Sequence, residues 1–189
     1  MRSRACLLLL LPAAGCAEPQ PSARGYTLVE NGAYQATYAA SGRVERLAYD
    51  GNGDRRVDAI TFLAPSGRPA RAEADTDGDG LVDRWELFDD AGRLLRVGRA
   101  LHARARADVW EYADGKGGFS RREFDDDGDG RAERIEHSVE GRVAAEDLDT
   151  DGDGRCERRL IRDAGGQTIR IEIDDDGDGN FEKALPVRP

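Results

Sequence analysis

The sequence is short of the side chains from which a large hydrophobic core is built. Of its 189 residues only 6% are aromatic and 39% hydrophobic, whereas 35% are charged. Such a chain is soluble once processed, but apolar packing supplies little of the stability that a single large core would need. We therefore expect a second source of stability.

Recognisable catalytic motifs are also lacking. The sequence has no Gly-x-Ser-x-Gly motif, no phosphate-binding loop and no Cys-x-x-Cys pair. Its two histidines, His102 and His137, have no second His or Cys at metal-binding spacing. We read both as surface or strand residues and expect that the protein is not an enzyme.

The first fifteen residues have the layout of a bacterial export signal. Arg2 and Arg4 precede an apolar stretch with five consecutive leucines, which is too short to span a bilayer stably. The small residues directly before Cys16 resemble the lipobox of bacterial lipoproteins, and this resemblance implies cleavage after Gly15 and lipidation of Cys16. The alternative is an ordinary signal peptide, with Cys16 incidental. Residues 16–25 then form the lipidated N-terminus and a flexible tether.

The N-terminal segment indicates where the protein is located and which cysteine remains without a disulfide partner. We expect an exported protein of the bacterial cell envelope, in particular an outer-membrane lipoprotein that faces the periplasm or the cell surface. Cys6 lies in the signal peptide and Cys16 carries the lipid, which leaves Cys156 alone, without a disulfide partner. The formal charge of −10 becomes −12 without Arg2 and Arg4, which disfavours nucleic acid and anionic lipid surfaces as partners.

Five segments of the chain share one acidic pattern, with oxygen-bearing side chains at positions 1, 3, 5 and 9. The segments are Asp50, Asn52, Asp54 and Asp58; Asp75, Asp77, Asp79 and Asp83; Asp125, Asp127, Asp129 and Glu133; Asp149, Asp151, Asp153 and Glu157; and Asp174, Asp176, Asp178 and Glu182. Their spacing indicates units of about 25 residues that start near 50, 75, 100, 125, 149 and 174. The unit near 100 has lost the first three loop acids, so we expect it to be metal-free.

The acidic pattern predicts calcium loops. Carboxylates packed into nine residues repel one another unless a hard cation lies among them, and oxygen ligands on a glycine-containing loop suit Ca²⁺. Position 7 is expected to add a backbone carbonyl, from Arg56, Leu81, Arg131, Arg155 and Asn180. The prediction is thus up to five Ca²⁺ sites. The loop at Asp50 is expected to bind most weakly, because Asn52 replaces an acid and Arg55 stands where the other loops have glycine.

Between the acidic loops the sequence predicts β-hairpins. A glycine lies eight residues before the start of each unit, at Gly42, Gly67, Gly92, Gly117, Gly141 and Gly166. Trp85 and Leu87, and likewise Trp110 and Tyr112, alternate as in half-buried strands. We expect an all-β antiparallel meander over residues 26–189, as a single domain with a twisted or coiled sheet. One face is expected to be apolar, and the other to carry Arg and Glu residues, which are Arg96, Arg121, Arg170, Glu123, Glu172, Glu86, Glu111 and Glu136.

Two family resemblances accompany this pattern. The acidic segments resemble the D-x-D-G-D-G-x-x-D/E calcium loops of FG-GAP repeats, and Trp85 to Leu94 resembles the YD (Rhs-type) hairpin repeat. The first resemblance implies calcium loops that join strands, and neither identifies a ligand. An EF-hand or dockerin-like protein is an alternative, since Asp75 to Glu86 fits a twelve-residue EF-hand loop. A further alternative is that the loops are solvated turns without metal.

These observations lead to one main functional expectation. We expect a calcium-stabilised, non-enzymatic structural or adhesive repeat lipoprotein, with the membrane as a partner through its lipid and an unknown protein or glycan as a second partner. A calcium sensor, buffer or assembly module of EF-hand type is one alternative. A ligand-binding surface module is another, with Trp85 and Trp110 as a glycan-stacking platform, although we favour a packing role for both tryptophans.

Overall fold

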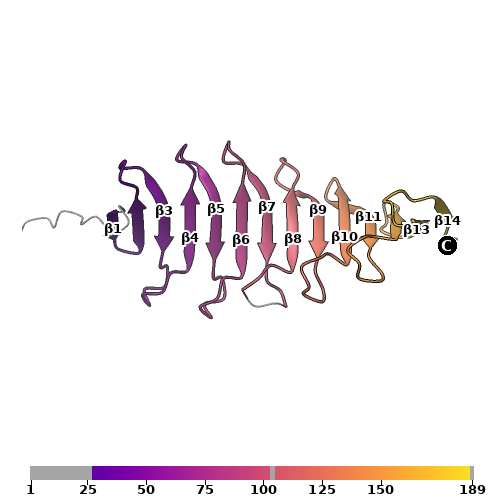
Figure 1. Ribbon diagram of the computed structural model, residues 1–189, viewed down its shortest axis with the longest axis horizontal. Helices are drawn as coiled ribbons and strands as arrows, with labels where there is room; N and C mark the ends of the chain where they lie inside the picture. Colours follow the sequence, from indigo (N-terminus) through magenta and orange to yellow (C-terminus); the bar gives the residue numbers. More distant parts are fainter. Residues whose placement is uncertain (1–26, 103–104, 188–189) are drawn as a thin grey trace, which may run out of the picture.

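The chain folds into one long antiparallel sheet. The computed structural model describes residues 27–102 and 105–187. Fourteen strands follow each other in the sheet in the order of the sequence, so the predicted all-β meander is confirmed (Figure 1). The strands are β1 (Thr27–Asn31), β2 (Tyr34–Tyr38), β3 (Val44–Tyr49), β4 (Ala59–Leu63), β5 (Pro69–Ala74), β6 (Arg84–Phe88), β7 (Leu94–Arg99), β8 (Val109–Ala113), β9 (Phe119–Phe124), β10 (Arg134–Val139), β11 (Arg142–Leu148), β12 (Arg158–Arg162), β13 (Thr168–Ile173) and β14 (Lys183–Pro186).

Short turns and acidic loops alternate along this meander. The predicted turn glycines have positive φ, as in Gly92 with φ of 77° between β6 and β7. There the Asp89 carboxylate accepts hydrogen bonds from the backbone N–H groups of Ala91 and Arg93, which closes the turn. The acidic loops join one hairpin to the next. The EF-hand alternative is therefore wrong, because β5 and β6 flank the loop at Asp75 where an EF-hand needs two helices.

The predicted separation of apolar and charged faces is wrong in part. Residues directly opposite each other in neighbouring strands point to the same face of a sheet. Arg96 lies opposite both Leu87 and Tyr112, and Glu123 lies opposite Trp110. Arg121, Arg170 and Glu172 share this face in the same way, so the side that carries the tryptophans is also charged. Glu86, Glu111 and Glu136 lie on the opposite face, as expected.

Arginines of the returning strands cover the aromatic rings of their neighbours. The Arg96 guanidinium lies 4.1 Å from the Trp110 ring centroid, and Gly98 leaves the room into which this indole packs. Arg71 lies 4.3 Å from the Phe62 ring centroid. Such contacts combine apolar contact by the arginine stem with attraction between the cation and the ring. Trp110 is thus a packing residue, as we favoured from the sequence.

Little of the molecule is fully buried. In the described part of the chain, the buried hydrophobic side chains are Ala48, Val97 and Val109. Contacts between strands connect only strands that are neighbours in sequence, so the sheet remains one layer. The strands turn progressively along its length and appear foreshortened towards β13 and β14 (Figure 1). Among the described residues, no helix has the length and apolar character needed to cross a membrane.

Candidate functional site

The acidic loops lie along one edge of the sheet. Each precedes an even-numbered strand, from β4 to β14, so all of them belong to the same edge of the antiparallel sheet. Figure 1 shows the loops before β4, β6 and β8 below the sheet. Consecutive loops are two strands apart, which corresponds to about 10 Å at a strand separation of about 4.8 Å. The repeat thus places similar polar groups at regular intervals along the molecule.

One hydrogen-bond scheme recurs in the loops and is clear at Asp75. The Asp75 carboxylate accepts N–H bonds from Gly78 and Gly80, each at 2.7 Å. At the end of the loop, Asp83 accepts the N–H of Thr76 and also its hydroxyl proton. Glycine at positions 4 and 6 has positive φ, of 79° at Gly78 and 90° at Gly80, a region that glycine enters without steric cost. These hydrogen bonds and glycine conformations therefore turn the acidic side chains towards the inside of the loop.

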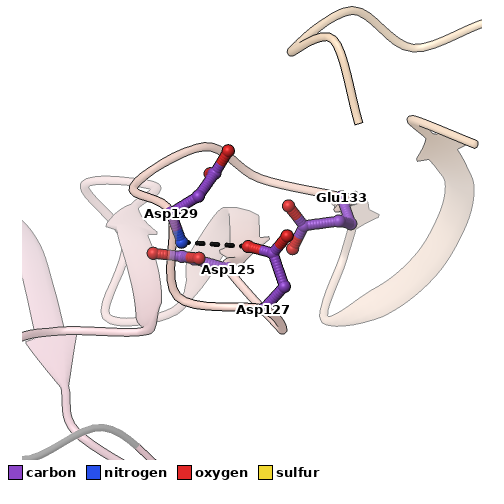
Figure 2. Close-up of side chains that lie close together, drawn as sticks. All are labelled: Asp125, Asp127, Asp129 and Glu133. Carbon is purple, nitrogen blue, oxygen red and sulfur yellow. Dashed lines mark hydrogen bonds between the residues drawn. The ribbon is translucent and has the colours of Figure 1, made fainter. Parts of the chain in front are cut away.

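Four of the five predicted loops bring acidic ligand atoms together. In each group one atom per residue lies within 4.8 Å of all the others. Figure 2 shows the loop before β10, where the carboxylates of Asp127 and Glu133 face each other beside Asp125 and Asp129. The groups are Asp75, Asp77 and Asp83; Asp125, Asp127, Asp129 and Glu133; Asp149, Asp151, Asp153 and Glu157; and Asp174, Asp176, Asp178 and Glu182.

The loop at Asp50 keeps the backbone scheme without forming such an acidic group. Asp50 accepts N–H bonds from Gly53 and Arg55, at 2.7 and 2.9 Å. Within the described part of the chain, its acids are not among the groups that gather around a common point. Arg55 has φ of 71°, in a region that costs a non-glycine residue of the order of 1 kcal/mol. Among the five predicted loops this one is thus the least suited to a metal, and its weak binding stays a prediction.

The loop before β8, in the unit near residue 100, stabilises itself without the lost acids. Asp108 is buried and accepts the backbone N–H groups of Leu101 and His102, at 2.7 and 2.5 Å. The His102 ring nitrogen Nδ1 lies 3.6 Å from Asp108. Position 9 of the repeat therefore has a structural role that does not depend on a metal.

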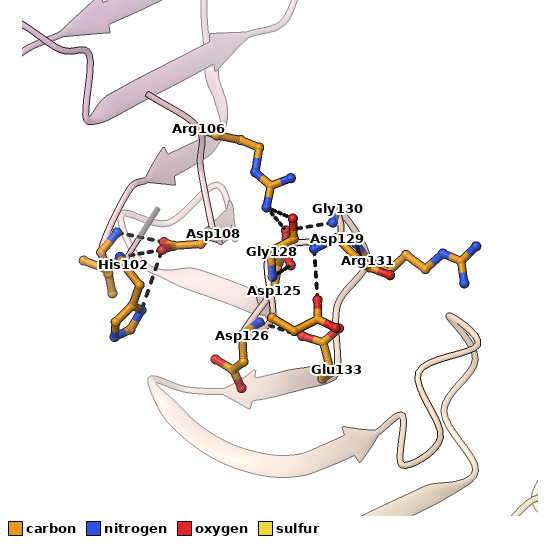
Figure 3. Close-up of polar contacts among 12 residues, drawn as sticks. His102, Arg106, Asp108, Asp125, Asp126, Gly128, Asp129, Gly130, Arg131 and Glu133 are labelled. Carbon is orange, nitrogen blue, oxygen red and sulfur yellow. Dashed lines mark hydrogen bonds and ion pairs between the residues drawn. The ribbon is translucent and has the colours of Figure 1, made fainter. Parts of the chain in front are cut away.

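Arginines at loop position 7 connect neighbouring loops. Arg106 donates to Asp125 and to the carbonyl of Gly128 in the next loop (Figure 3). Arg131 and Arg155 reach the following loops in the same way, where they donate to carbonyl groups that include Gly177 O for Arg155, at 2.8 Å. This link was not predicted from the sequence, where position 7 was expected to supply only a backbone carbonyl. The recurrence of arginine there was the available signal.

Backbone hydrogen bonds favour the charged form of Asp75 and Asp174, which are the first acids of two loops. Removal from solvent raises the pKa of Asp75, but the hydrogen bonds from the N–H groups of Gly80 and Gly78 outweigh this effect and lower the pKa. The same balance, with Gly179 and Gly177 as donors, lowers the pKa of Asp174. Even in bulk water, two unit charges at the 4.8 Å limit of these groups repel by about 0.9 kcal/mol.

The donor set is of the kind that hard divalent cations such as calcium accept. Each group offers three or four carboxylates and contains no His or Cys, which disfavours zinc and copper. Calcium accepts six to eight oxygen ligands in flexible geometry, so water and a carbonyl can complete the set. Asp79 is outside the group at Asp75, and the carbonyl ligands at position 7, which are Leu81, Arg131, Arg155 and Asn180, stay predictions. Cys16 lies outside the described residues.

Comparison with known proteins gives distant structural similarity alone. No protein-family model and no curated protein matches the sequence. One similar solved structure is the GtfA/B complex bound to UDP and GlcNAc, with a TM-score of 0.42 and 10% identity, over 61% of this chain and 26% of that one. Another is the complex of accessory secretory proteins 1, 2 and 3 of Streptococcus pneumoniae, with a TM-score of 0.38 and 14% identity over 66% and 22%. The chain spans about a quarter of each neighbour's length.

Proposed function

We propose that this chain is a calcium-stabilised, non-enzymatic β-repeat protein with a structural or adhesive role at the bacterial cell envelope. The observation that carries the proposal is the gathering of carboxylate oxygens within 4.8 Å in four successive loops that link the hairpins. In each loop the backbone N–H groups orient the acids, which reduces the reorganisation required when a cation binds. The resemblance to FG-GAP loops and YD (Rhs-type) hairpins agrees with this function.

Calcium acts in this proposal as a folding ligand. A single-layer sheet with three buried hydrophobic side chains in its described part has little core to stabilise it. A cation that binds the folded loops but not the unfolded chain adds its binding free energy to stability, which amounts to about 2.7 kcal/mol per site at a hundredfold excess over Kd. This stabilisation acts on the loops that connect one hairpin to the next.

Thermal unfolding of the exported chain tests the calcium role. We expect the melting temperature to rise on adding millimolar calcium to chelator-treated protein, and to rise less with magnesium, which demands stricter octahedral geometry. Circular dichroism follows both transitions. An unchanged melting temperature in calcium contradicts the proposal.

Membrane attachment is a separate part of the proposal. We propose that residues 1–15 are the signal peptide and that lipid on Cys16 anchors the domain, with residues 16–25 as its tether. Metabolic labelling with a fatty acid, followed by membrane fractionation, tests this in a bacterial host. We expect label and membrane association in the wild type and loss of both in Cys16→Ala. Labelling that persists in the variant contradicts anchoring at Cys16.

A further inference from the structure

A charge-free area covers part of one face of the first five strands, beyond which Glu45 of β3 alternates with Leu47 and Tyr49 onto the same face. Two rows of directly paired residues run across β1 to β5 on this face. The first row is Asn31, Tyr34, Tyr49, Ala59 and Ala74, and the second is Val29, Ala36, Leu47, Thr61 and Ala72. None of these ten residues is charged, in a chain in which 35% of residues are. We call these ten residues the N-terminal patch.

The patch ends sharply and has no equivalent on the other face of the same strands. In the next strand, Arg84 lies opposite Ala74 and Glu86 opposite Ala72, and the two side chains form an ion pair at 2.6 Å. On the other face, charged residues of β1 to β5 lie at matching positions. They are Glu30, Arg46, Arg71 and Glu73.

The large side chains of the patch are open to solvent. Tyr34 is 58% exposed, and Val29, Leu47 and Tyr49 are each close to 40% exposed. The rings of Tyr34 and Tyr49 lie together, with centroids 4.9 Å apart. In the described part of the chain every strand contacts only its sequence neighbours, so no strand folds back over the patch.

The size of the patch disfavours a free-standing dimer. Five strands and two residue rows cover an area of roughly 300–400 Å², from strand spacings of about 4.8 Å and row spacings of about 6.8 Å. A stable protein interface buries about 800 Å² on each partner. A surface of half that size needs a second attachment to remain bound, and a tether supplies this by raising the effective concentration to the millimolar range.

We propose that the N-terminal patch rests on the lipid bilayer to which the chain is anchored, with Tyr34 and Tyr49 at the level of the lipid headgroups. This inference rests on the proposed anchoring at Cys16. Ten residues separate Cys16 from β1, a reach of at most about 35 Å, whereas β14 lies roughly 60 Å further along the sheet. Tyrosine is enriched at membrane interfaces, and the absence of charge spares this face the cost of desolvating ions.

Tryptophan quenching in tethered protein tests the contact. A chain that begins at Cys16 contains every described residue and is coupled through this thiol to a maleimide-headgroup lipid in phosphatidylcholine vesicles with dibrominated phosphatidylcholine. Mass spectrometry of the digested protein confirms that Cys16 is coupled and that Cys156 is not. Tyr34→Trp reports the patch, and Leu185→Trp is the matched control, since Leu185 is 52% exposed in β14 at the far end of the sheet. The wild type gives the emission of Trp85 and Trp110 for subtraction.

We expect the brominated lipid to remove most of the added emission in Tyr34→Trp and little of it in Leu185→Trp. Adding Leu47→Glu to Tyr34→Trp is expected to abolish the quenching without lowering the melting temperature, because Leu47 is partly exposed. Unquenched emission at position 34, equal quenching at position 185, or quenching that survives Leu47→Glu overturns the proposal. So does a dimer of the uncoupled protein, measured by sedimentation, that Leu47→Glu dissociates.

Chemical coupling attaches Cys16 to the vesicle bilayer whether or not this residue is lipidated in the cell. Absence of natural lipidation is therefore detected separately, by the metabolic labelling described above. Calcium binding is likewise read from the melting temperature in the same samples, so failure of either proposed function is distinguishable from failure of the membrane contact.

Discussion

Arg131 donates a hydrogen bond from its guanidinium to the backbone carbonyl of Asp153, at 2.8 Å, and so ties the loop before β10 to the loop before β12. Arg106 and Arg155 make the corresponding links on either side. The loops are therefore in contact with each other as well as with the strands that they join. Leu81 occupies the same position in the loop at Asp75 and lacks a polar head to make the link.

Arg131→Leu should loosen two neighbouring loops. It removes an exposed, charge-assisted hydrogen bond, and we expect a loss of about 0.5–1 kcal/mol in the free energy of unfolding. Urea unfolding measures it, with Arg158→Leu as a control that removes the same charge from an exposed position in β12. Equal losses in the two variants would show that net charge, and not the link, is responsible.

Glu157→Gln should have opposite effects with and without calcium. Glu157 is one of four acids gathered in the loop before β12, so its neutralisation relieves repulsion in chelator and removes a ligand in calcium. We expect an equal or higher melting temperature in chelator and a lower one in calcium, relative to the wild type.

The matched control for that experiment is Glu172→Gln. Glu172 pairs with Arg170 at 2.7 Å on β13, outside the acidic loops. Its substitution should change the melting temperature by the same small amount in both conditions. A similar shift for Glu157→Gln in chelator and in calcium would argue against a metal at this loop.

Asp108→Ala should destabilise the protein independently of calcium. The change leaves the N–H groups of Leu101 and His102 without their carboxylate acceptor, at a cost of about 2 kcal/mol. Denaturant titrations in chelator and in calcium should give the same loss. A loss confined to calcium would instead assign a metal to the loop before β8.

Arg55→Gly should stabilise the loop at Asp50. Arg55 has φ of 71°, where glycine is free of the steric penalty of about 1 kcal/mol, and the Arg55 N–H bond to Asp50 is retained. Glycine also adds freedom to the unfolded chain, so we expect Arg55→Gly to have a free energy of unfolding about 1 kcal/mol higher than that of Arg56→Gly. Arg56→Gly is the control, because Arg56 does not have positive φ and glycine there only adds freedom to the unfolded chain.

Asp147 should contribute to acid sensitivity. Burial raises the pKa of Asp147, but hydrogen bonds from Arg159 and His137 outweigh burial and lower the pKa. A lowered pKa in the folded state gives stability that is present above the unfolded pKa of about 3.9 and is lost as the pH falls through the folded value.

The difference in unfolding free energy between wild type and Asp147→Asn should therefore shrink as the pH falls below about 4. Measurements in chelator remove any contribution of metal bound at the acidic loops from the comparison. A difference that stays constant from neutral to acidic pH would contradict the role of the Asp147 carboxylate.

The Cys156 thiol should react slowly with maleimide or disulfide reagents. Burial and the nearby acids raise its pKa to about 11, from 9.0, which reduces the thiolate fraction at neutral pH by about 100-fold. Reaction rates in folded and urea-unfolded protein measure this. Equal rates in the two states would contradict it.

The loops and their period were predictable because their chemistry is local. Asp75, Gly78 and Gly80 interact within a few residues of each other, so the spacing in the sequence is the spacing that the fold uses. Alternation within a strand, as at Trp85 and Leu87, is local in the same sense.

Contacts between strands and between loops were harder to predict. The face of the sheet on which Arg96 lies depends on its pairing with Leu87 and Tyr112 in the neighbouring strands. The alternation of residues within a single strand does not reveal how that strand pairs with its neighbours. The link from Arg131 to Asp153 spans 22 residues and depends on the distance between neighbouring loops. The N-terminal patch likewise depends on the register of five strands, which no single strand contains.

Because the strands follow one another in strict sequence order, the number of units sets the length of the sheet. Each added unit of about 25 residues brings one more hairpin and extends the sheet by about 10 Å, with no rearrangement of the units already present. Duplication or loss of one unit in the gene thus changes the reach of the protein in fixed steps, while the two ends keep their own surfaces.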